Sequence, residues 1–477
     1  MNRPCDLDAV TGRDLILKKS LSPVELLDSC IDQIGSVNPK VNAVVATCFD
    51  RAREEAKQAE VKSGDLPPLH GLPILIKDLQ ETEGLLTTHG SLLYKDHLPE
   101  ADESNVAALR AAGAIVMGKT NTPEFGAGAH TVNKVYGATG NPFDPKRTCG
   151  GSSGGSGVAL ALNMAPLATG SDSGGSLRIP AAYCGVVAHR STPGVVPTEK
   201  HGIGFTTYGV QGAMARTIAD TRLMQSVMAR YDASDPLSTP WTEGRFGSAE
   251  PVDLSTLRVA VSEDLGFAHV DDGLRSVFRD RVSSLQSVFK ECVDVAPDLG
   301  DVRRCNWVLR AVHFLSRHRD HYEKRCDELG QNVIDNYEAG LKLDAAEITW
   351  ALREQTNIFR SMNHFFQEFD LLICPTVAIP PFPIAQLYCD QINDVKFDNY
   401  VEWMALTWGL TIPGNPITAL PCGFDATGMP FGLQVCGPYY QDEFVLDAAG
   451  ALEDVFAKDP SHARPVSDLA GATSQTI

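Results

Sequence analysis

Apolar residues follow two different periods along the first part of the chain. After Ser22 they recur every three or four positions, and the run Ser-Pro-Val-Glu forms a capping box, so a helix is predicted from Ser22 to about Ile34. A second helical pattern covers residues 49–59 and ends in the breaker run SGDLPPLHGLP. The following ILIKDL is apolar up to Lys77, which predicts a short buried strand with Lys77 at its end.

Helices and strands continue to alternate beyond Lys77. SNVAALRAA predicts a helix over residues 104–112 that Gly113 ends, and AIVMGKT predicts the next strand; this order is typical of an α/β fold with parallel strands. Residues 126–157 are rich in glycine, so we expect a long ordered loop until VALALNM begins a helix. The stretch GSDSGGSLRIP at residues 170–180 is expected to be a second shaped loop, because it is too polar and glycine-rich for a buried strand.

The second half of the chain has a different order of elements. Residues 230–255 are turn-rich and could connect two lobes, and LRVAVSEDL then predicts a strand. Residues 270–370 have a helical period, and residues 370–435 return to strands and turns. A length of 477 residues allows either one large domain or two fused halves.

Composition narrows the classes of function. The formal charge of −19 repels phosphate backbones and argues against direct binding of nucleic acid. No apolar run approaches the ~18 residues that a membrane span requires. The start, MNRPCDLDAVTGRDL, has acidic residues where a signal peptide needs an apolar core, and the 12 cysteines are scattered without a CxxC pair, as in a reduced protein. We therefore expect a cytoplasmic protein with no membrane association.

Several candidate chemistries lack a residue that they require. The run GGSSGGSG at residues 150–157 has no lysine after its last glycine, so it is not a phosphate-binding P-loop. A Ser-His-Asp triad is not indicated, because Ser176 is not in a G-x-S-x-G elbow and neither glycine-rich loop contains a histidine. The residues His313, His318 and His321 lack HExxH spacing, so an exposed helix face is expected there and no metal site.

Two serine-bearing glycine loops that follow a lysine at a strand end form a specific combination. The stretch GGSSGGSGVALALNMAPLATGSDSGGSLRIPAA at residues 150–182 resembles the signature of the amidase signature family. The resemblance extends to GLPILIKDL, GKTNTPEF, GATGNPFD, GAMARTIAD and MPFGLQVCG, and so runs over nearly the whole chain. It implies a single amidase domain over residues 1–477, with a large mixed twisted β-sheet covered by helices on both faces. It also implies catalysis without a metal or an organic cofactor.

The resemblance assigns catalytic roles by position. It makes Lys77 the catalytic lysine, Ser152 the serine that follows a cis peptide bond, and Ser176 the nucleophile. These roles agree with the chemistry, because a serine hydroxyl needs a base at pH 7 and a lysine is a base only when burial lowers its pKa. The apolar residues before Lys77 could supply that desolvation.

Further site residues follow from the same resemblance and from the geometry that an oxyanion requires. Consecutive backbone N–H groups converge most easily where side chains are small, which favours an oxyanion hole at Ser173, Gly174 and Gly175, with the Ser176 N–H beside them. Supporting roles fall to Ser153, Asp172 and Arg178. Substrate-pocket walls are expected at Gly126, Ala127 and Gly128, and in the divergent helical region of residues 300–410.

The expected function is hydrolysis of a carboxamide C–N bond through an acyl-enzyme on Ser176. Related anilides, carbamates or esters remain open as substrates, and we expect a small-molecule amide and a monomer or homodimer. One alternative is the glutaminase subunit of a tRNA-dependent amidotransferase, but such subunits typically carry glutamine where this chain has Ile179. Another is a non-catalytic binding relative. Residues 188–192, AHRST, depart from the family's Gly-Leu-Lys-Pro-Thr run, so the adjoining wall is expected to differ in shape, with His189 in a structural role.

Overall fold

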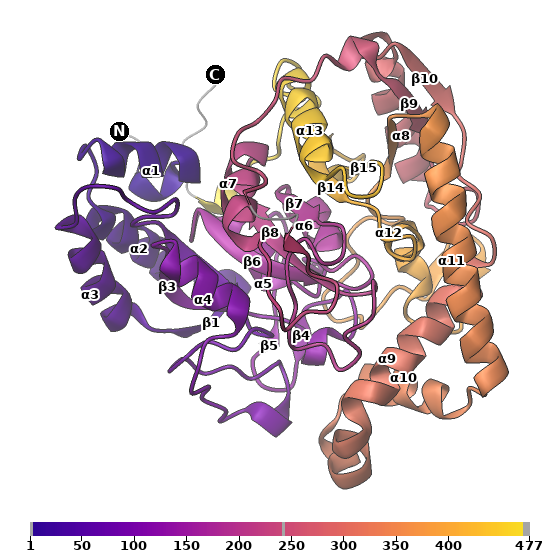
Figure 1. Cartoon of the computed structure of the whole chain (residues 1–477), viewed down its shortest axis with the longest axis horizontal. Helices are drawn as coiled ribbons and strands as arrows, with labels where there is room; N and C mark the ends of the chain where they lie inside the picture. Colours follow the sequence, from indigo (N-terminus) through magenta and orange to yellow (C-terminus); the bar gives the residue numbers. More distant parts are fainter. Residues whose placement is uncertain (1–2, 241–243, 471–477) are drawn as a thin grey trace.

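A computed structural model describes residues 3–240 and 244–470 of the chain. Eleven strands form one sheet in the order β1-β3-β2-β6-β8-β7-β14-β15-β11-β9-β10 (Figure 1). Their bounds are β1 Val44–Thr47, β2 Pro73–Lys77, β3 Ile115–Thr120, β6 Leu167–Asp172, β7 Val187–Arg190, β8 Val210–Ala215, β9 Arg258–Val261, β10 Glu291–Asp294, β11 Leu371–Pro375, β14 Ile417–Phe424 and β15 Pro430–Cys436. Two further two-stranded sheets join β4 Val132–Asn133 to β5 Gly137–Ala138 and β12 Gln391–Ile392 to β13 Val395–Lys396.

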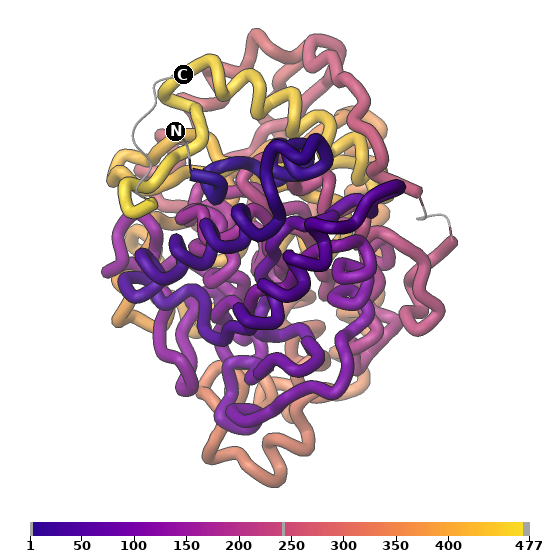
Figure 2. The backbone as a smooth tube through the Cα atoms, turned by 90° about the vertical axis from the view of Figure 1, so that its left-hand side faces the viewer, coloured from indigo at the N-terminus to yellow at the C-terminus, as the bar shows by residue number. Residues whose placement is uncertain are grey.

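Helices cover both faces of this sheet, as the resemblance implies. Their bounds within the described ranges are α1 Ala9–Leu17, α2 Pro23–Val41, α3 Phe49–Glu60, α4 Ser104–Ala111, α5 Gly154–Ala161, α6 Arg178–Cys184, α7 Ile218–Met228, α8 Asp272–Leu285, α9 Val302–Arg325, α10 Gln331–Leu341, α11 Ala345–Glu368, α12 Ala405–Thr411 and α13 Asp442–Phe456. The helices α9 and α11 lie on the opposite side of the molecule from α1 to α3 (Figure 1), and the tube view brings the N- and C-terminal segments to the same end (Figure 2).

Strand direction changes across the sheet. The strands β2, β3 and β6 are parallel to one another, as are β9, β10 and β11. Between these groups, β8, β7, β14 and β15 each pair antiparallel with their neighbours. The parallel order expected for the first strands is confirmed, and the complete sheet is mixed.

Two large apolar clusters fill the space between sheet and helices. One contains the buried side chains of α2, β2, β3 and α5, and the other those of β9, β11, β14, β15 and α13. The strands β2 and β6 are buried along nearly their whole length, so the residues at their ends are held in fixed positions. No helix in the described part of the chain is long and apolar enough to cross a membrane.

The first predicted helix is confirmed at its start and is longer than expected. Ser22 Oγ accepts hydrogen bonds from Val24 N and Glu25 N, and the Glu25 carboxylate accepts from Ser22 N, so the capping box is complete. The helix continues past Ile34 to Val41. Asn38 explains where it ends, because its side-chain oxygen accepts the N–H groups of the two residues that follow the turn, at 2.8 Å each.

The helix after the first glycine loop begins earlier than predicted. It starts at Gly154, inside the glycine run, and not at the apolar VALALNM. A β-carbon on Gly154 would lie 2.2 Å from Thr131 Oγ1, and one on Gly155 would lie 2.3 Å from Asn121 N. These glycines therefore allow the first turn of the helix to pack directly against the neighbouring loop.

Two other predictions require correction. Residues 170–172 belong to strand β6 and not to a loop, because the carboxylate of Asp172 is neutralised by arginines and the strand can end in the core. The region of residues 370–435 contains the short helix α12, which is buried on all sides and so lacks an amphipathic period. The region of residues 270–370 is mainly helical, as predicted, and also contains the four-residue strand β10.

Candidate active site

Lys77 is the last residue of β2, and its side chain is fully buried. Its backbone N–H donates to Thr169 Oγ1 on the neighbouring β6 at 2.9 Å, which links the two strand ends. Its Nζ lies 2.7 Å from Ser152 Oγ, 2.9 Å from Ser153 Oγ and 2.9 Å from Ser171 Oγ. One amine is therefore in contact with three serine hydroxyls.

The protonation state of this amine follows from its surroundings. Burial lowers the pKa of Lys77 from 10.5 to about 7, while the negative charge of Asp172 opposes that change. A neutral amine has two N–H groups and one lone pair, so at most two of the three hydroxyls accept a hydrogen bond from it. The third hydroxyl then donates its proton to the lone pair, which is the arrangement that a general base requires.

Ser152 and Ser153 end the first glycine-rich loop, directly before α5. The peptide bond between Gly151 and Ser152 is cis, as the resemblance implies. Ser153 is the N-cap residue of α5, and its Oγ accepts a hydrogen bond from Ser171 N at 3.3 Å. The Ser153 backbone N–H donates to the Ser176 carbonyl oxygen at 3.1 Å, so the two glycine-rich loops are held side by side.

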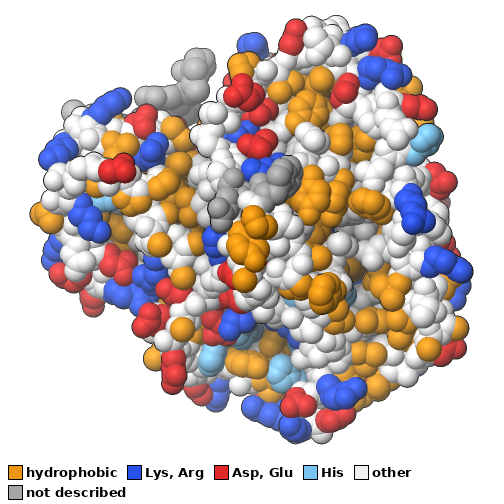
Figure 3. Space-filling view, in the orientation of Figure 1, with side chains coloured by type: hydrophobic (Ala, Val, Ile, Leu, Met, Phe, Trp, Pro, Cys, Tyr) orange, Lys and Arg blue, Asp and Glu red, His pale blue; other side chains and the backbone are white. Residues whose placement is uncertain are grey.

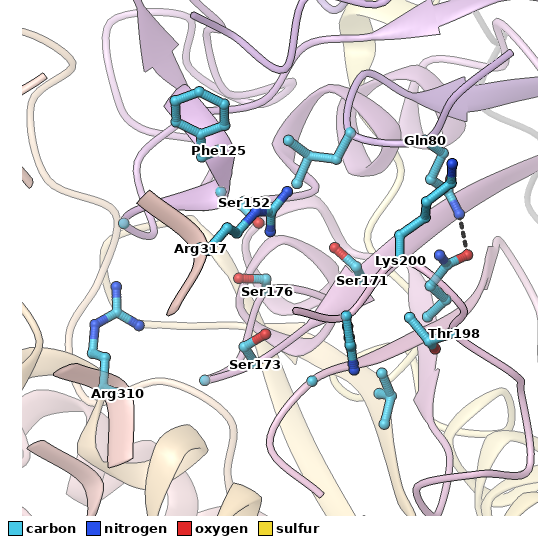
Figure 4. A pocket seen from close by; sticks show the side chains of 18 of the residues that line it. Gln80, Phe125, Ser152, Ser171, Ser173, Ser176, Thr198, Lys200, Arg310 and Arg317 are labelled. Carbon is cyan, nitrogen blue, oxygen red and sulfur yellow. Dashed lines mark hydrogen bonds between the residues drawn. The ribbon is translucent and has the colours of Figure 1, made fainter. Parts of the chain in front are cut away.

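Ser176 lies in the turn between β6 and α6 and faces a cavity of about 130 Å³. The close-up shows Ser152, Ser171, Ser173 and Ser176 around the same space (Figure 4). Within the described residues Ser176 Oγ has no hydrogen-bond partner, whereas Ser152 Oγ is in contact with Lys77. The three predicted residues thus meet around one cavity, and no hydrogen bond joins Ser152 to Ser176.

The backbone of the nucleophile turn is shaped by Gly175. It has φ +120°, and a β-carbon there would lie 2.3 Å from Thr407 Oγ1. Its N–H donates to Asp172 Oδ1 at 2.8 Å, so this one of the expected oxyanion donors is already engaged. The N–H groups of Ser173, Gly174 and Ser176 have no partner in the part of the chain that the structure describes. These three are the donors available to an oxyanion.

Asp172 and Arg178 form the predicted pair, and Arg190 joins them. The guanidinium of Arg178 donates to both carboxylate oxygens of Asp172, at 3.0 Å each, and Arg190 Nη1 lies 3.4 Å from Asp172 Oδ1. All three side chains are fully buried. Burial alone would raise the pKa of the Asp172 carboxyl, but the two positive charges outweigh it and hold that pKa well below its usual range. The cluster fixes the start and the end of the nucleophile turn.

We expect Asp172→Asn to lower the free energy of unfolding by about 3–5 kcal/mol, because it leaves two buried guanidinium groups without an anion. Urea unfolding at pH 7 measures this loss. The depressed pKa means that the carboxylate stabilises the fold above about pH 3.9 and loses this effect as the pH falls towards its folded pKa, so the deficit of the variant shrinks in acid. Equal unfolding energies at pH 7 would contradict the prediction.

A matched control is Asp320→Asn, which removes an exposed carboxylate paired with Lys324 on the surface of α9. It is expected to leave unfolding unchanged within error, because exposed ion pairs contribute little.

The glycine loop of residues 126–128 supplies part of the cavity wall. Gly126 and Gly128 line the cavity with Ser176, as expected. Ala127 does not: its side chain packs with Phe125 and Val333 in a small apolar cluster. A β-carbon at Gly126 would lie 3.2 Å from Ser152 Oγ, so a glycine here leaves room beside that hydroxyl.

The cavity wall also contains residues that the sequence did not indicate individually. From the divergent region come Arg310 and Arg317 of α9 and the apolar Met404, and from elsewhere come the polar Gln80, Glu103, Ser171, Lys200, His201 and Gln211. Ser171 is the only one with a sequence signal, since it lies inside the quoted signature between Gly170 and Asp172. The others are scattered over the chain, and only the fold brings them together.

The histidines of α9 are not on an exposed face, which corrects the sequence prediction. His318 is buried with its ring tilted against that of Phe125, and its Nδ1 lies 3.2 Å from Nδ1 of the half-buried His321. His313 stacks on Tyr208 with ring centroids 5.0 Å apart. Aromatic rings from other elements cover this side of the helix, and such contacts are not visible in its own periodicity.

His189 is buried beside Thr418 and does not line the cavity, in agreement with a structural role.

One group of described residues has the composition of a metal site. Glu81, His89 and His97 place their ligand atoms within 4.8 Å of one another. Both rings already donate to the Glu81 carboxylate, at 3.0 and 2.9 Å. Burial would raise the pKa of Glu81, but these two hydrogen bonds lower it to about 2. The group does not line the cavity at Ser176, and its hydrogen bonds link the segments that follow β2.

Comparisons with known proteins agree with this site. Residues 25–446 match the Amidase family model. An acylamidase from Rhodococcus erythropolis is 33% identical over 470 residues, covering 97% of this chain and 96% of that protein. A glutamyl-tRNA(Gln) amidotransferase subunit from Geobacillus stearothermophilus is 32% identical over 483 residues, covering 95% and 97%. A solved bacterial aryl acylamidase of the amidase signature family superposes with a TM-score of 0.88 at 25% identity, over 98% of this chain and 99% of that one. The chain therefore belongs to the amidase signature family.

Proposed function

We propose that this protein is a serine hydrolase that cleaves carboxamide C–N bonds. The observation that carries the proposal is the buried Lys77 amine in contact with Ser152, which shares a cavity with Ser176. A lysine with a pKa of about 7 is in large part neutral at physiological pH and can accept a proton.

In the first half of the reaction, Ser176 Oγ attacks the amide carbonyl carbon. Its proton passes to Ser152, whose own proton passes to the Lys77 amine. The carbonyl oxygen becomes an oxyanion, and the N–H groups of Ser173, Gly174 and Ser176 are placed to donate to it. The C–N bond then breaks, and Ser152 gives a proton to the departing amine and regains one from Lys77. The Lys77 amine is then neutral again, and an ester on Ser176 remains.

In the second half, water hydrolyses this ester. The water loses a proton through Ser152 to Lys77 and attacks the acyl carbon. The C–O bond to Ser176 breaks, the serine regains a proton, and a carboxylic acid leaves. Substrate binding is expected to bring Ser176 Oγ within hydrogen-bond distance of Ser152 Oγ, since catalytic hydrogen bonds commonly tighten only in the complex.

The names of the relatives support acyl amides and aryl amides as the first substrates to examine. One relative is an acylamidase and one solved neighbour is an aryl acylamidase. We therefore propose acyl anilides as test substrates, with aryl carbamates and esters as related compounds that the same acyl-enzyme chemistry covers. We propose a cytoplasmic enzyme that works as a monomer or homodimer.

The proposal is tested by aniline release from a panel of acyl anilides and aryl carbamates. Intact mass measurement after rapid acid quenching should show the acyl group added to the protein, and peptide mapping should place it on Ser176. The proposed nucleophile would be contradicted if turnover occurs with no adduct on Ser176 and slowing the reaction shows the adduct on another residue.

We expect kcat/KM to rise about tenfold per pH unit below pH 7 and to level off above it. The neutral form of Lys77 is the base, and its fraction increases as the pH rises through its pKa of about 7. A pH–rate profile between pH 5 and 9 with a neutral anilide measures this. A rate that is flat over this range, or that falls as the pH rises through 7, would contradict a lysine base.

A glutaminase role is the second candidate, because amidotransferase subunits are among the relatives. Ile179, where such subunits typically have glutamine, is buried in α6 and is a departure from their pattern. Purification from the native host with two partner chains, together with release of ammonia from glutamine, would favour this role over the hydrolysis of anilides.

A further inference from the structure

The cavity at Ser176 continues into a second cavity. The two have volumes of about 130 and 110 Å³. They share the side chains of Phe125, Lys200, His201, Arg310 and Arg317. Three of these shared residues are cations, and they lie where the cavities meet. A substrate that is bound at Ser176 and extends into the second cavity therefore passes them.

Two of the cations come from one face of a single helix. Arg310 and Arg317 are seven positions apart on α9, which is two turns, so both side chains project from the same side. In the close-up both lie on the α9 side of the serines (Figure 4). Lys200 approaches from the segment between β7 and β8, on the other side of Ser176 and Ser173. The positive charges thus surround the cavity.

None of these cations has an anionic partner among the described residues. Arg310 is almost fully buried, and its guanidinium bonds only to neutral groups, Asn336 Oδ1 at 2.8 Å and the Tyr400 hydroxyl. Arg317 and Lys200 form no hydrogen bond or ion pair with any residue that the structure describes, and both are open to solvent within the hollow. By contrast, acidic and basic side chains are interspersed over the outer face of the molecule (Figure 3).

The one acidic side chain in the cavity wall does not neutralise them. Glu103 accepts hydrogen bonds from Gln211 Nε2 at 2.7 Å and from Glu81 N at 3.0 Å. Burial raises its pKa to about 7, so it carries only part of a negative charge at neutral pH. Burial also lowers the pKa of the nearby ring of His201, which leaves that imidazole neutral. The field in the cavity is therefore positive, although the chain as a whole has a formal charge of −19.

A protein rarely keeps cations crowded together without anions, because their desolvation and mutual repulsion are unfavourable. A ligand that brings a negative charge removes this cost. The planar fork of a guanidinium matches the two oxygens of a carboxylate, and an ammonium group adds a third donor set.

We propose that the substrate is an amide that also carries a carboxylate, which binds between Arg317, Arg310 and Lys200. This inference rests on the proposed hydrolase function and specifies its substrate class. The small volume and polar walls suit a short dicarboxylic monoamide or a carboxylated anilide better than a long acyl chain. Arg317 and Lys200 are specificity-determining residues in this proposal, and they do not take part in the chemical steps.

The kinetic test compares matched anilides that differ by one carboxylate group. N-phenylsuccinamate is compared with butyranilide, which places the carboxylate on the acyl side, and 4-acetamidobenzoate with acetanilide, which places it on the amine side. In at least one pair the carboxylated compound should have a kcat/KM about ten- to hundredfold higher. Arg317→Gln should lower kcat/KM for the carboxylated compound at least tenfold more than for its neutral partner, and Arg317→Lys should retain part of the preference. Equal effects of Arg317→Gln on both members of each pair, or a preference for both neutral compounds, would overturn the proposal.

The matched control is Arg319→Gln, which removes an exposed arginine of the same helix outside the cavity and should change neither member of a pair. A binding test separates this proposal from the hydrolase proposal. Calorimetry of the Ser176→Ala variant with glutarate should show binding that weakens at least tenfold with Arg317→Gln and that glutaramide does not reproduce. If glutarate binds in this way but no amide is cleaved, the carboxylate site stands and the hydrolase proposal is rejected. If anilides are cleaved but glutarate does not bind, the hydrolase proposal stands and the carboxylate site is rejected.

Discussion

Ser176→Ala is expected to lower kcat for any amide substrate by on the order of 10⁵-fold or more, because it removes the atom that forms the acyl-enzyme. The side chain is only partly buried, and its Oγ has no hydrogen bond to a described residue, so the substitution should leave the fold intact. Steady-state release of aniline measures the rate, and thermal unfolding checks the fold. Labelling by a fluorophosphonate probe, which reacts with activated serines, should disappear in the same variant.

The comparison variant is Ser173→Ala. This serine lies three positions away, lines the same cavity, and is proposed to act through its backbone N–H and not its hydroxyl. It should keep the probe reaction and most of the activity. Labelling that persists in Ser176→Ala and disappears in Ser173→Ala would transfer the role of nucleophile to Ser173.

Lys77→Ala is expected to lower kcat/KM by ~10³-fold, which is within the usual contribution of a general base. The variant removes the only amine in contact with Ser152 among the described residues and leaves the serine hydroxyls without a proton acceptor. It also vacates a buried space at the end of β2, so small primary amines such as ethylamine should restore part of the rate. Recovery that follows the concentration of the neutral amine would identify the missing group as a base.

Lys119→Met provides the matched control for losing a buried amine. Lys119 lies on β3 beside β2, is fully buried, and donates to the Gln80 carbonyl oxygen and to Thr82 Oγ1. It should destabilise the protein and change kcat/KM by less than tenfold. If both variants lose activity in proportion to their loss of stability, Lys77 has a structural role only.

Local chemistry was sufficient to predict several elements and the centre of the site. The capping box at Ser22 marks a helix start with neighbours in sequence alone, and the apolar run before Lys77 predicts both its strand and its burial. The signature resemblance placed Ser152 and Ser176 beside that lysine, and the structure brings all three to one cavity.

Tertiary contacts account for what the sequence could not indicate. The start of α5 at Gly154 depends on how closely Thr131 approaches, and Gly175 donates to Asp172 only because of the turn's three-dimensional path. The cations Arg317 and Lys200 are separated from each other and from Ser176 along the chain, and nothing in their own neighbourhoods distinguishes them from surface residues. Their importance depends on the cavity that the complete fold creates.

The support of the nucleophile turn is spread over the length of the chain. Arg178 Nη1 donates to Thr407 O at 2.9 Å and to Gln434 Oε1 at 2.7 Å, and the second of these partners is 256 residues further along. A ribosome builds the chain from its N-terminus, so the serine turn emerges early and its last supporting side chain emerges late. Until β15 has been synthesised and added to the sheet, Arg178 lacks one of the hydrogen bonds that hold the turn carrying Ser176. Synthesis of β15 is thus a condition for complete assembly of this turn.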